Sequence, residues 1–117
     1  RGLGDVYKRQ QLANYRRSDR PGAASISDVR GQGLLVGIDL DGVDGIDAST
    51  FAAMAAYRAW ELGLVVYVVR DNVLECTPAL TITESELLAG IQRLLVAIDD
   101  VAQGRVDPKD VAQFEGW

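Results

Sequence analysis

The sequence has 117 residues, which is enough for one domain and too few for two ordinary ones. Hydrophobic residues make up 48% and charged residues 25% of the chain, a globular composition that excludes a disordered or fibrous protein. There is no histidine and one cysteine, Cys76. Serine–histidine and cysteine–histidine catalysis, histidine–zinc sites and an internal disulfide are therefore excluded within this chain.

Charge is distributed unevenly along the chain. Residues 1–20 carry six basic and two acidic side chains, a balance of +4, whereas residues 21–117 carry six basic and fifteen acidic ones, a balance of −9. We expect no nucleic-acid partner, because phosphate binding needs a clustered basic face. The longest apolar stretch, residues 62–69, is too short to span a membrane, so no membrane association is expected. The sequence shows no secretory signal, and the expected location is cytoplasmic.

The first ten residues, RGLGDVYKRQ, show neither helical nor strand periodicity. They resemble translated sequencing-adapter read-through, so we expect residues 1–10 to be a non-native leader. The end of a helix is predicted next, over residues 11–17, with Leu12, Ala13 and Tyr15 as its apolar positions. Residues 18–27 are rich in small polar residues and are predicted to form a loop.

A strand, a loop and a helix are predicted in the middle of the chain. The strand covers residues 34–40, and the loop covers the glycine- and aspartate-rich residues 41–47. Ser49 is the expected N-cap of the helix, and Gly63 is the expected glycine just past its end. The apolar positions that fall on one face of this helix are Phe51, Met54, Ala55, Ala59 and Leu62.

A β-hairpin is predicted after this helix. Residues 64–69 are rich in valine and read as a strand, and residues 73–77 return antiparallel to it. Asp71 and Asn72 are expected to form a two-residue turn, because both residue types tolerate positive φ. Pro78 then ends the ladder, since proline has no N–H to donate.

The last long helix has the clearest start signal. Thr83 and Glu86 have the spacing of a capping box, and Gly104 is the expected stop. Asp107 and Pro108 then look like the cap and first residue of a short final helix. The expected apolar stripe of the long helix consists of Leu87, Ile91, Leu94, Leu95 and Ile98. Together these elements predict an α+β fold, a small mostly antiparallel sheet with helices packed on one face.

Two acidic or glycine-rich motifs fail the tests for known binding sites. The glycines of RGQG at residues 30–33 precede a strand instead of joining a strand to a helix, so a tight turn is favoured over a dinucleotide site. Asp39, Asp41, Asp44 and Asp47 do not match the ligand positions of a calcium loop, which favours a solvated acidic turn and no metal site.

The remaining reactive residue types form no catalytic group that the sequence can diagnose. Cys76 lies in a predicted strand without a neighbouring base, which favours a buried structural thiol. Glu61 and Glu75 lack a carboxylate partner at a diagnostic spacing. Lys8 lies in the leader and Lys109 beside the final helix, so neither is expected to be a desolvated nucleophile.

Three ordered motifs carry a specific resemblance. They are DVRGQGLLVGIDL at residues 28–40, AWELGLVV at residues 59–66 and NVLECTPALTIT at residues 72–83. Their order and spacing resemble the C-terminal small domain of class III pyridoxal-phosphate-dependent aminotransferases, which have the fold-type I architecture. The resemblance divides the chain into the leader (1–10), a helix end and loop (11–25) and the small domain (26–117).

The resemblance implies a fragment of a larger enzyme. That enzyme would transfer an amino group from an amino acid or amine to a 2-oxo acid with pyridoxal 5′-phosphate as its cofactor. The catalytic lysine and the other cofactor-binding residues of the family lie upstream of Arg1, in a large domain that is the expected partner of this one. The fragment alone is expected to be inactive and to bind no pyridoxal phosphate, and the parent is expected to be a homodimer.

One residue departs from the family pattern. Where several members have an arginine that contacts a substrate carboxylate, this chain has Glu75. The resemblance makes Glu75 a candidate substrate-binding residue for an amino donor with a cationic or neutral distal group. Alternatively, Glu75 pairs with a nearby arginine and does not meet the substrate. A free-standing α+β module that binds a ligand or partner without catalysis is the alternative for the whole chain.

Overall fold

The computed structural model describes residues 2–30, 36–43, 45–70, 72–76, 83–107, 109 and 111. Its helices and strands follow one another in the order α1 (Gly2–Arg16), β1 (Ile26–Arg30), β2 (Val36–Leu40), α2 (Ala48–Glu61), β3 (Tyr67–Val69), β4 (Val73–Cys76) and α3 (Glu84–Ala102), with a short 3-10 turn, η1 (Ala23–Ser25), before β1. No helix in the described ranges is long and apolar enough to cross a membrane.

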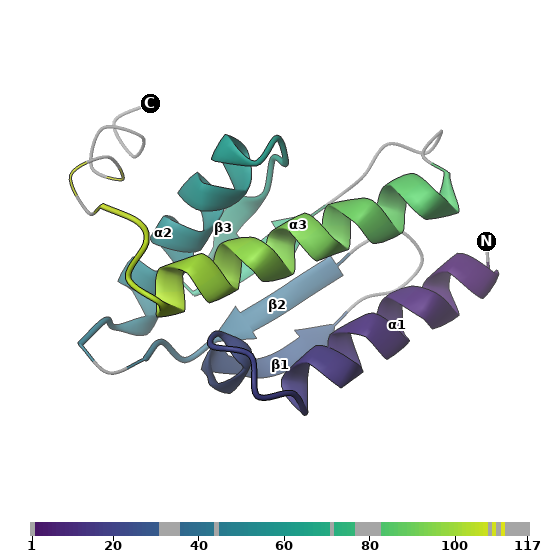
Figure 1. The fold of residues 1–117 in the computed structure, drawn as a ribbon, viewed down its shortest axis with the longest axis horizontal. Helices are drawn as coiled ribbons and strands as arrows, with labels where there is room; N and C mark the ends of the chain where they lie inside the picture. The colour runs from purple at the N-terminus through teal and green to yellow at the C-terminus, as the bar shows by residue number, and fades with distance from the viewer. Residues whose placement is uncertain are drawn as a thin grey trace.

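The four strands form one sheet in the order β1-β2-β4-β3, and all neighbouring strands are antiparallel. The helices α1, α2 and α3 lie on the same side of this sheet (Figure 1). The predicted α+β fold, with an antiparallel sheet and helices on one face, is therefore confirmed.

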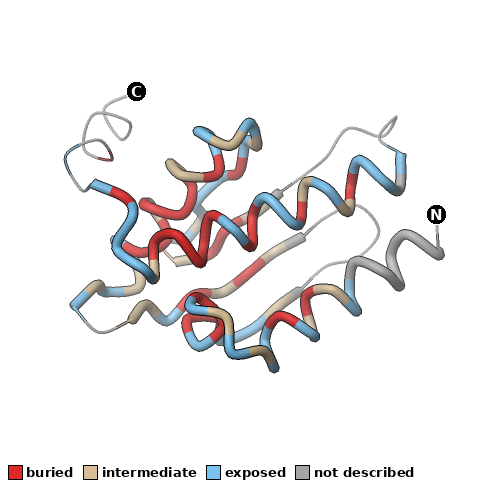
Figure 2. The backbone as a smooth tube through the Cα atoms, in the orientation of Figure 1, coloured by how far each residue is buried: buried red, intermediate tan, exposed pale blue. Residues whose placement is uncertain are grey.

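Buried residues lie where α2 and α3 meet the central strands. Phe51 of α2 and Ile38 of β2 have no exposed surface, and Leu74 of β4 is 1% exposed. Along α3, buried and exposed stretches alternate, as in an amphipathic helix (Figure 2). All five residues predicted for the apolar stripe of α3 are buried, namely Leu87, Ile91, Leu94, Leu95 and Ile98.

The first helix extends further toward the N-terminus than the sequence predicted. We expected residues 1–10 to lack regular structure, but α1 begins at Gly2. Helix formation there needs no apolar stripe, because leucine, lysine, arginine and glutamine have good intrinsic helix propensity. Leu12 and Tyr15, two of the three predicted apolar positions, are buried. Whether residues 1–10 are a non-native leader stays a prediction.

The predicted loop over residues 18–27 is wrong at its C-terminal end. The chain makes the 3-10 turn η1 and then enters β1 at Ile26. Pairing with β2 overrides the polar character of this segment, since Ile26 lies opposite Leu40 and Val29 opposite Ile38. The register shifts between Ile26 and Asp28, which marks a β-bulge.

The start of α2 also differs from the prediction. Asp47, not Ser49, is the N-cap, and its carboxylate accepts a hydrogen bond of 2.7 Å from the backbone N–H of Thr50. This bond lowers the pKa of Asp47 below its usual value. The predicted end is confirmed, because Gly63 follows the helix with a φ of +90°.

The hairpin has a longer connection than expected. Val69 pairs with Val73, so three residues, 70–72, join the strands where we predicted two. The residue with positive φ in the described part of this connection is Arg70, at 53°. Strand β3 covers only the last three residues of the predicted strand at 64–69. Thr77, Pro78 and Ala79 lie outside the described residues.

The capping box at the start of α3 is confirmed. The N–H of Glu86 donates to the Thr83 hydroxyl and the N–H of Thr83 donates to the Glu86 carboxylate, both at 3.1 Å. Gly104 has a φ of +76° just past the helix, as its predicted role requires. After it, Asp107 accepts a hydrogen bond from the Lys109 N–H at 2.9 Å, as a cap would. Pro108 lies outside the described residues.

Candidate functional site

The candidate residue Glu75 lies on the face of the sheet that the helices do not cover. In β4 it follows Leu74, which is buried opposite Ile38 of β2, and neighbouring residues of a strand point to opposite faces. Glu75 is paired with Gly37 of β2 on one side and with Tyr67 of β3 on the other. These three residues therefore form one row on what we call the helix-free face.

The described neighbours of Glu75 on the adjacent strands are a glycine and a tyrosine. Its neighbour Gly37 has no side chain, and its other neighbour, Tyr67, is 61% exposed. Glu75 itself is half-buried. Among the described side chains, none is found in a hydrogen bond or ion pair with its carboxylate. A half-buried carboxylate between a glycine and a tyrosine can accept hydrogen bonds from a cation or a neutral donor.

The backbone register leaves the arginine alternative open. Arg30 of β1 is paired with Gly37, so it stands in the same row as Glu75 but two strands away. Adjacent strands are about 4.8 Å apart, which puts the two backbones roughly 10 Å from each other. The side chain of Arg30 is not described.

Other acidic residues have structural partners. Glu61 lies near Arg58, with an N–O distance of 3.4 Å, and accepts a hydrogen bond of 3.3 Å from the Tyr57 hydroxyl. In the loop after β2, Asp47 caps α2. Across the described ranges, no group of three or more histidine, cysteine, aspartate or glutamate side chains is arranged to hold a metal ion. The interpretation of residues 41–47 as a solvated acidic turn without a metal stays a prediction.

The structure describes the candidate nucleophiles and the RGQG motif only in part. Cys76 ends β4 opposite Val36, and the orientation and surroundings of its thiol lie outside the described side chains. Lys109 is exposed beyond α3. The glycines of the RGQG motif, residues 31 and 33, lie outside the described residues.

Sequence reasoning missed two carboxylates near the end of α3. Asp99 accepts hydrogen bonds from the Tyr15 hydroxyl at 2.6 Å, from the Gly22 N–H at 2.9 Å and from Arg20 Nε at 2.8 Å. Burial and the bond to Asp99 raise the pKa of the Tyr15 phenol far above its ordinary value. These three partners of Asp99 are 77 to 84 residues away from it in sequence, so a pattern of neighbouring residues cannot reveal them.

The adjacent residue, Asp100, has a separate set of partners. Its carboxylate accepts a hydrogen bond from Arg58 Nε of α2 at 2.8 Å and lies 3.6 Å from Arg105 Nη1. The bond to Asp100 raises the pKa of Arg58. Neither aspartate lies on the predicted apolar stripe of α3, so the helical periodicity contains no signal that the two carboxylates are buried.

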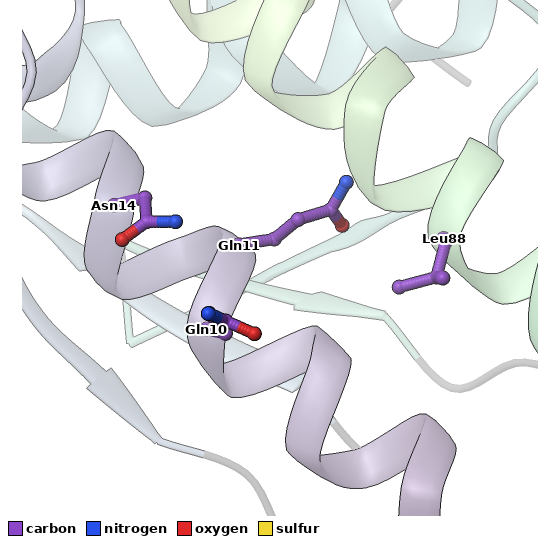
Figure 3. A pocket seen from close by; sticks show the side chains of 4 residues that line it. All are labelled: Gln10, Gln11, Asn14 and Leu88. Atoms are coloured by element: carbon purple, nitrogen blue, oxygen red, sulfur yellow. The ribbon is translucent and has the colours of Figure 1, made fainter.

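A groove of about 350 Å³ lies between α1 and α3, lined by Gln10, Gln11, Asn14 and Leu88. Figure 3 shows Gln11 extending from α1 toward α3. Its Oε1 atom is buried and has no hydrogen-bond partner among the described residues. The described lining residues, three amides and a leucine, include no group that titrates near neutral pH.

Comparison with known proteins identifies relatives for most of the chain. No model of a protein family matches. Leucine/methionine racemase of Thermococcus litoralis is 42% identical over 94 residues, which are 79% of this chain and 21% of the racemase. Acetylornithine aminotransferase of Corynebacterium efficiens is 30% identical over 80 residues, 68% of this chain and 18% of that enzyme. The chain thus spans about a fifth of the length of the curated relatives it matches.

Solved structures agree with these relatives. A phospholyase from Arthrobacter superposes with a TM-score of 0.69 and 29% identity, covering 83% of this chain and 23% of the phospholyase. Acetylornithine aminotransferase from Elizabethkingia anophelis gives a TM-score of 0.62 and 26% identity, again with 83% of this chain and 23% of that enzyme covered.

The fold is therefore one that also occurs within aminotransferases of the fold-type I architecture. The sequence relatives indicate the family more specifically than the fold does. They include both racemases and acetylornithine aminotransferases. They confirm the resemblance that the three motifs indicated: this chain is homologous to part of the class III pyridoxal-phosphate-dependent enzymes.

Proposed function

We propose that this chain is the C-terminal small domain of a class III pyridoxal-phosphate-dependent aminotransferase. The complete enzyme transfers an amino group from an amino acid or amine to a 2-oxo acid. The observation that carries the proposal is the sequence identity of 30% to 37% with acetylornithine aminotransferases, which the chain matches over 18% of their length. A large cofactor-binding domain is then the partner of this one, and the parent is a homodimer.

The described residues of this chain do not form a site for the cofactor by themselves. A lysine must reach the cofactor from a sheltered position, but Lys109 is exposed beyond α3. The buried hydroxyl of Tyr15 and the carboxylate of Asp99 are bonded to each other. We therefore assign cofactor binding and the chemical step to the large domain, and propose that the isolated chain neither binds pyridoxal phosphate nor turns over substrate.

Glu75 is the residue of this chain that we assign to substrate. Its place on the helix-free face beside Gly37 and Tyr67, away from the helices, supports this role. A carboxylate repels the carboxylate of an acidic amino donor, so the proposed donor has a neutral or cationic distal group. The names of the relatives point the same way, since leucine, methionine, alanine and serine all have neutral side chains.

Racemisation is the second candidate activity. It is favoured by one observation: the identity with the leucine/methionine racemase, 42%, is higher than the 30% to 37% found for the acetylornithine aminotransferases. The two activities differ in their requirement for an acceptor. A racemase converts one amino acid alone, whereas an aminotransferase consumes a 2-oxo acid for every amino acid it deaminates.

The experiment begins with the DNA upstream of the codon for Gln11. We expect an open reading frame long enough to encode the large domain with its cofactor-binding lysine. The complete enzyme is then purified and given L-leucine with and without a 2-oxo acid, and the products are separated on a chiral column. Formation of D-leucine without acceptor supports the racemase, and stoichiometric loss of the 2-oxo acid supports the aminotransferase. A start codon at or just before Arg1 would refute both in favour of the free-standing module.

The role of Glu75 has its own test in the complete enzyme. Glu75→Arg should raise kcat/KM for acidic amino donors relative to neutral ones by about tenfold, equivalent to ~1.4 kcal/mol. Glu61→Arg is the matched control, because it makes the same charge reversal at the surface end of α2. An unchanged preference in Glu75→Arg would refute the substrate role.

A further inference from the structure

One carboxylate near the end of α3 holds the segment that joins α1 to the sheet. The Oδ1 atom of Asp99 accepts hydrogen bonds from the Tyr15 hydroxyl and the Gly22 N–H. Its Oδ2 atom binds the Arg20 guanidinium, at 2.8 Å from Nε and 2.7 Å from Nη2. We call Tyr15, Arg20, Gly22 and Asp99 the Asp99 anchor.

The members of the Asp99 anchor also contact one another. The Arg20 guanidinium lies over the Tyr15 ring, 4.8 Å from its centroid. The Asp99 side chain is 13% exposed, so its hydrogen bonds are shielded from water and strengthened by the lower local dielectric. Asp99 therefore binds the end of α1 and the following loop at three points: the Tyr15 hydroxyl, the Arg20 guanidinium and the Gly22 N–H.

The neighbouring carboxylate provides a natural comparison. Asp100 is one residue further along α3, about 100° around the helix axis, and binds Arg58 of α2 and Arg105 instead. Both carboxylates bind arginine and both are largely buried. They differ in what they hold, because Asp99 fixes α1 and its loop whereas Asp100 fixes α2.

We infer that Asp99 is a positioning residue that sets the direction in which α1 leaves the helical layer. This inference rests on the proposed function, in which the helix that ends at Arg16 leads from the cofactor-binding domain of the parent enzyme to this domain. The angle of α1 then decides how the small domain, with Glu75 on its helix-free face, is presented to the substrate. Loss of the anchor should impair substrate binding while leaving the small domain folded and the cofactor bound.

Hydrogen exchange measured by mass spectrometry on the 117-residue chain tests the anchor without any assumption about catalysis. In Asp99→Asn, peptides covering residues 9–22 should exchange roughly 10- to 100-fold faster, while peptides from α2 are unchanged. Asp100→Asn should give the opposite pattern, with faster exchange in α2. Equal acceleration in all peptides, or no acceleration in residues 9–22, would overturn the inference.

Two further measurements complete the test. Tyr15→Phe removes one donor but keeps the ring, so it should give a smaller, selective acceleration even if Asp99→Asn does not fold. In the complete enzyme, Asp99→Asn should raise KM for the amino donor severalfold with kcat and cofactor absorbance retained, and Asp100→Asn should not. An unchanged KM would overturn the positioning role. An inactive unmutated enzyme would instead refute the proposed function, and the exchange result on the isolated chain separates the two failures.

Discussion

Replacing Gly22 by alanine tests how closely the loop after α1 approaches α3. A methyl group built on Gly22 lies 2.5 Å from Ile98 Cγ2 and 2.9 Å from the Ile98 carbonyl carbon, and it also collides with the Tyr15 hydroxyl. The backbone conformation of Gly22 itself does not exclude alanine, because its φ of −90° and ψ of −6° are open to any residue. Neither neighbour can move away, because Ile98 is fully buried and Tyr15 is bonded to Asp99.

The cost of Gly22→Ala follows from two effects. Overpacking of a filled core costs about 1–3 kcal/mol. Moving the backbone to relieve the collision also weakens the hydrogen bond from the Gly22 N–H to Asp99, and a hydrogen bond to a charged group is worth about 1.5–3 kcal/mol. We expect a loss of about 3 kcal/mol in the free energy of unfolding, which lowers Tm by about 12 °C or more in a domain of this size.

Gly90→Ala is the matched control, because it adds the same methyl group within α3. There the methyl group meets Leu64 Cδ1 at 3.6 Å, an ordinary van der Waals contact. Alanine has a better helix propensity than glycine by about 1 kcal/mol, so Gly90→Ala should stabilise the chain. Urea unfolding followed by circular dichroism gives both values. A loss below about 0.5 kcal/mol in Gly22→Ala would refute the close approach of this loop to α3.

Three further predictions concern caps and titration. Thr83→Ala removes one bond of the capping box and should cost about 1 kcal/mol by urea unfolding. Accepting backbone N–H bonds lowers the pKa values of Asp47 and Glu86 in the folded chain, so both carboxylates stabilise it above their unfolded pKa values of about 4. This stabilising contribution is lost as the pH falls through the lower folded pKa values. Because Asp47→Ala removes one of the two carboxylates, the urea midpoint of this variant should fall less on acidification than that of the unmutated chain. Burial raises the pKa of Tyr15, so Tyr15→Phe should leave the tyrosinate absorbance reached by pH 11 unchanged. A smaller absorbance in that variant would show that the phenol ionises normally.

Elements with strong local signals were predicted well. The spacing of Thr83 and Glu86 is enough to place the start of α3, because a capping box satisfies backbone groups within a single turn. Gly63 and Gly104 mark the ends of α2 and α3 for a similar reason, since each has a positive φ that glycine adopts without strain. In these cases the residues that decide the structure are neighbours in sequence.

The prediction failed where distant segments decide the outcome. Residues 26 and 27 were placed in a loop, and β1 forms there because β2 offers a partner strand. The carboxylate of Asp99 was not recognised, because Tyr15, Arg20 and Gly22 reach it from the other end of the chain. Glu75 was found only through the resemblance, and nothing in its own segment indicates which side chains flank it.

The sequence alone thus determines the amphipathic helices, their caps and the motifs that indicate the family, because each of these depends on residues that are close together in the sequence. Only the tertiary structure decides which face of the sheet stays free of helices, that Glu75 lies on it between Gly37 and Tyr67, and that adjacent carboxylates of α3 hold different helices. These features arise from strand register and helix packing, which bring together groups that the sequence keeps far apart.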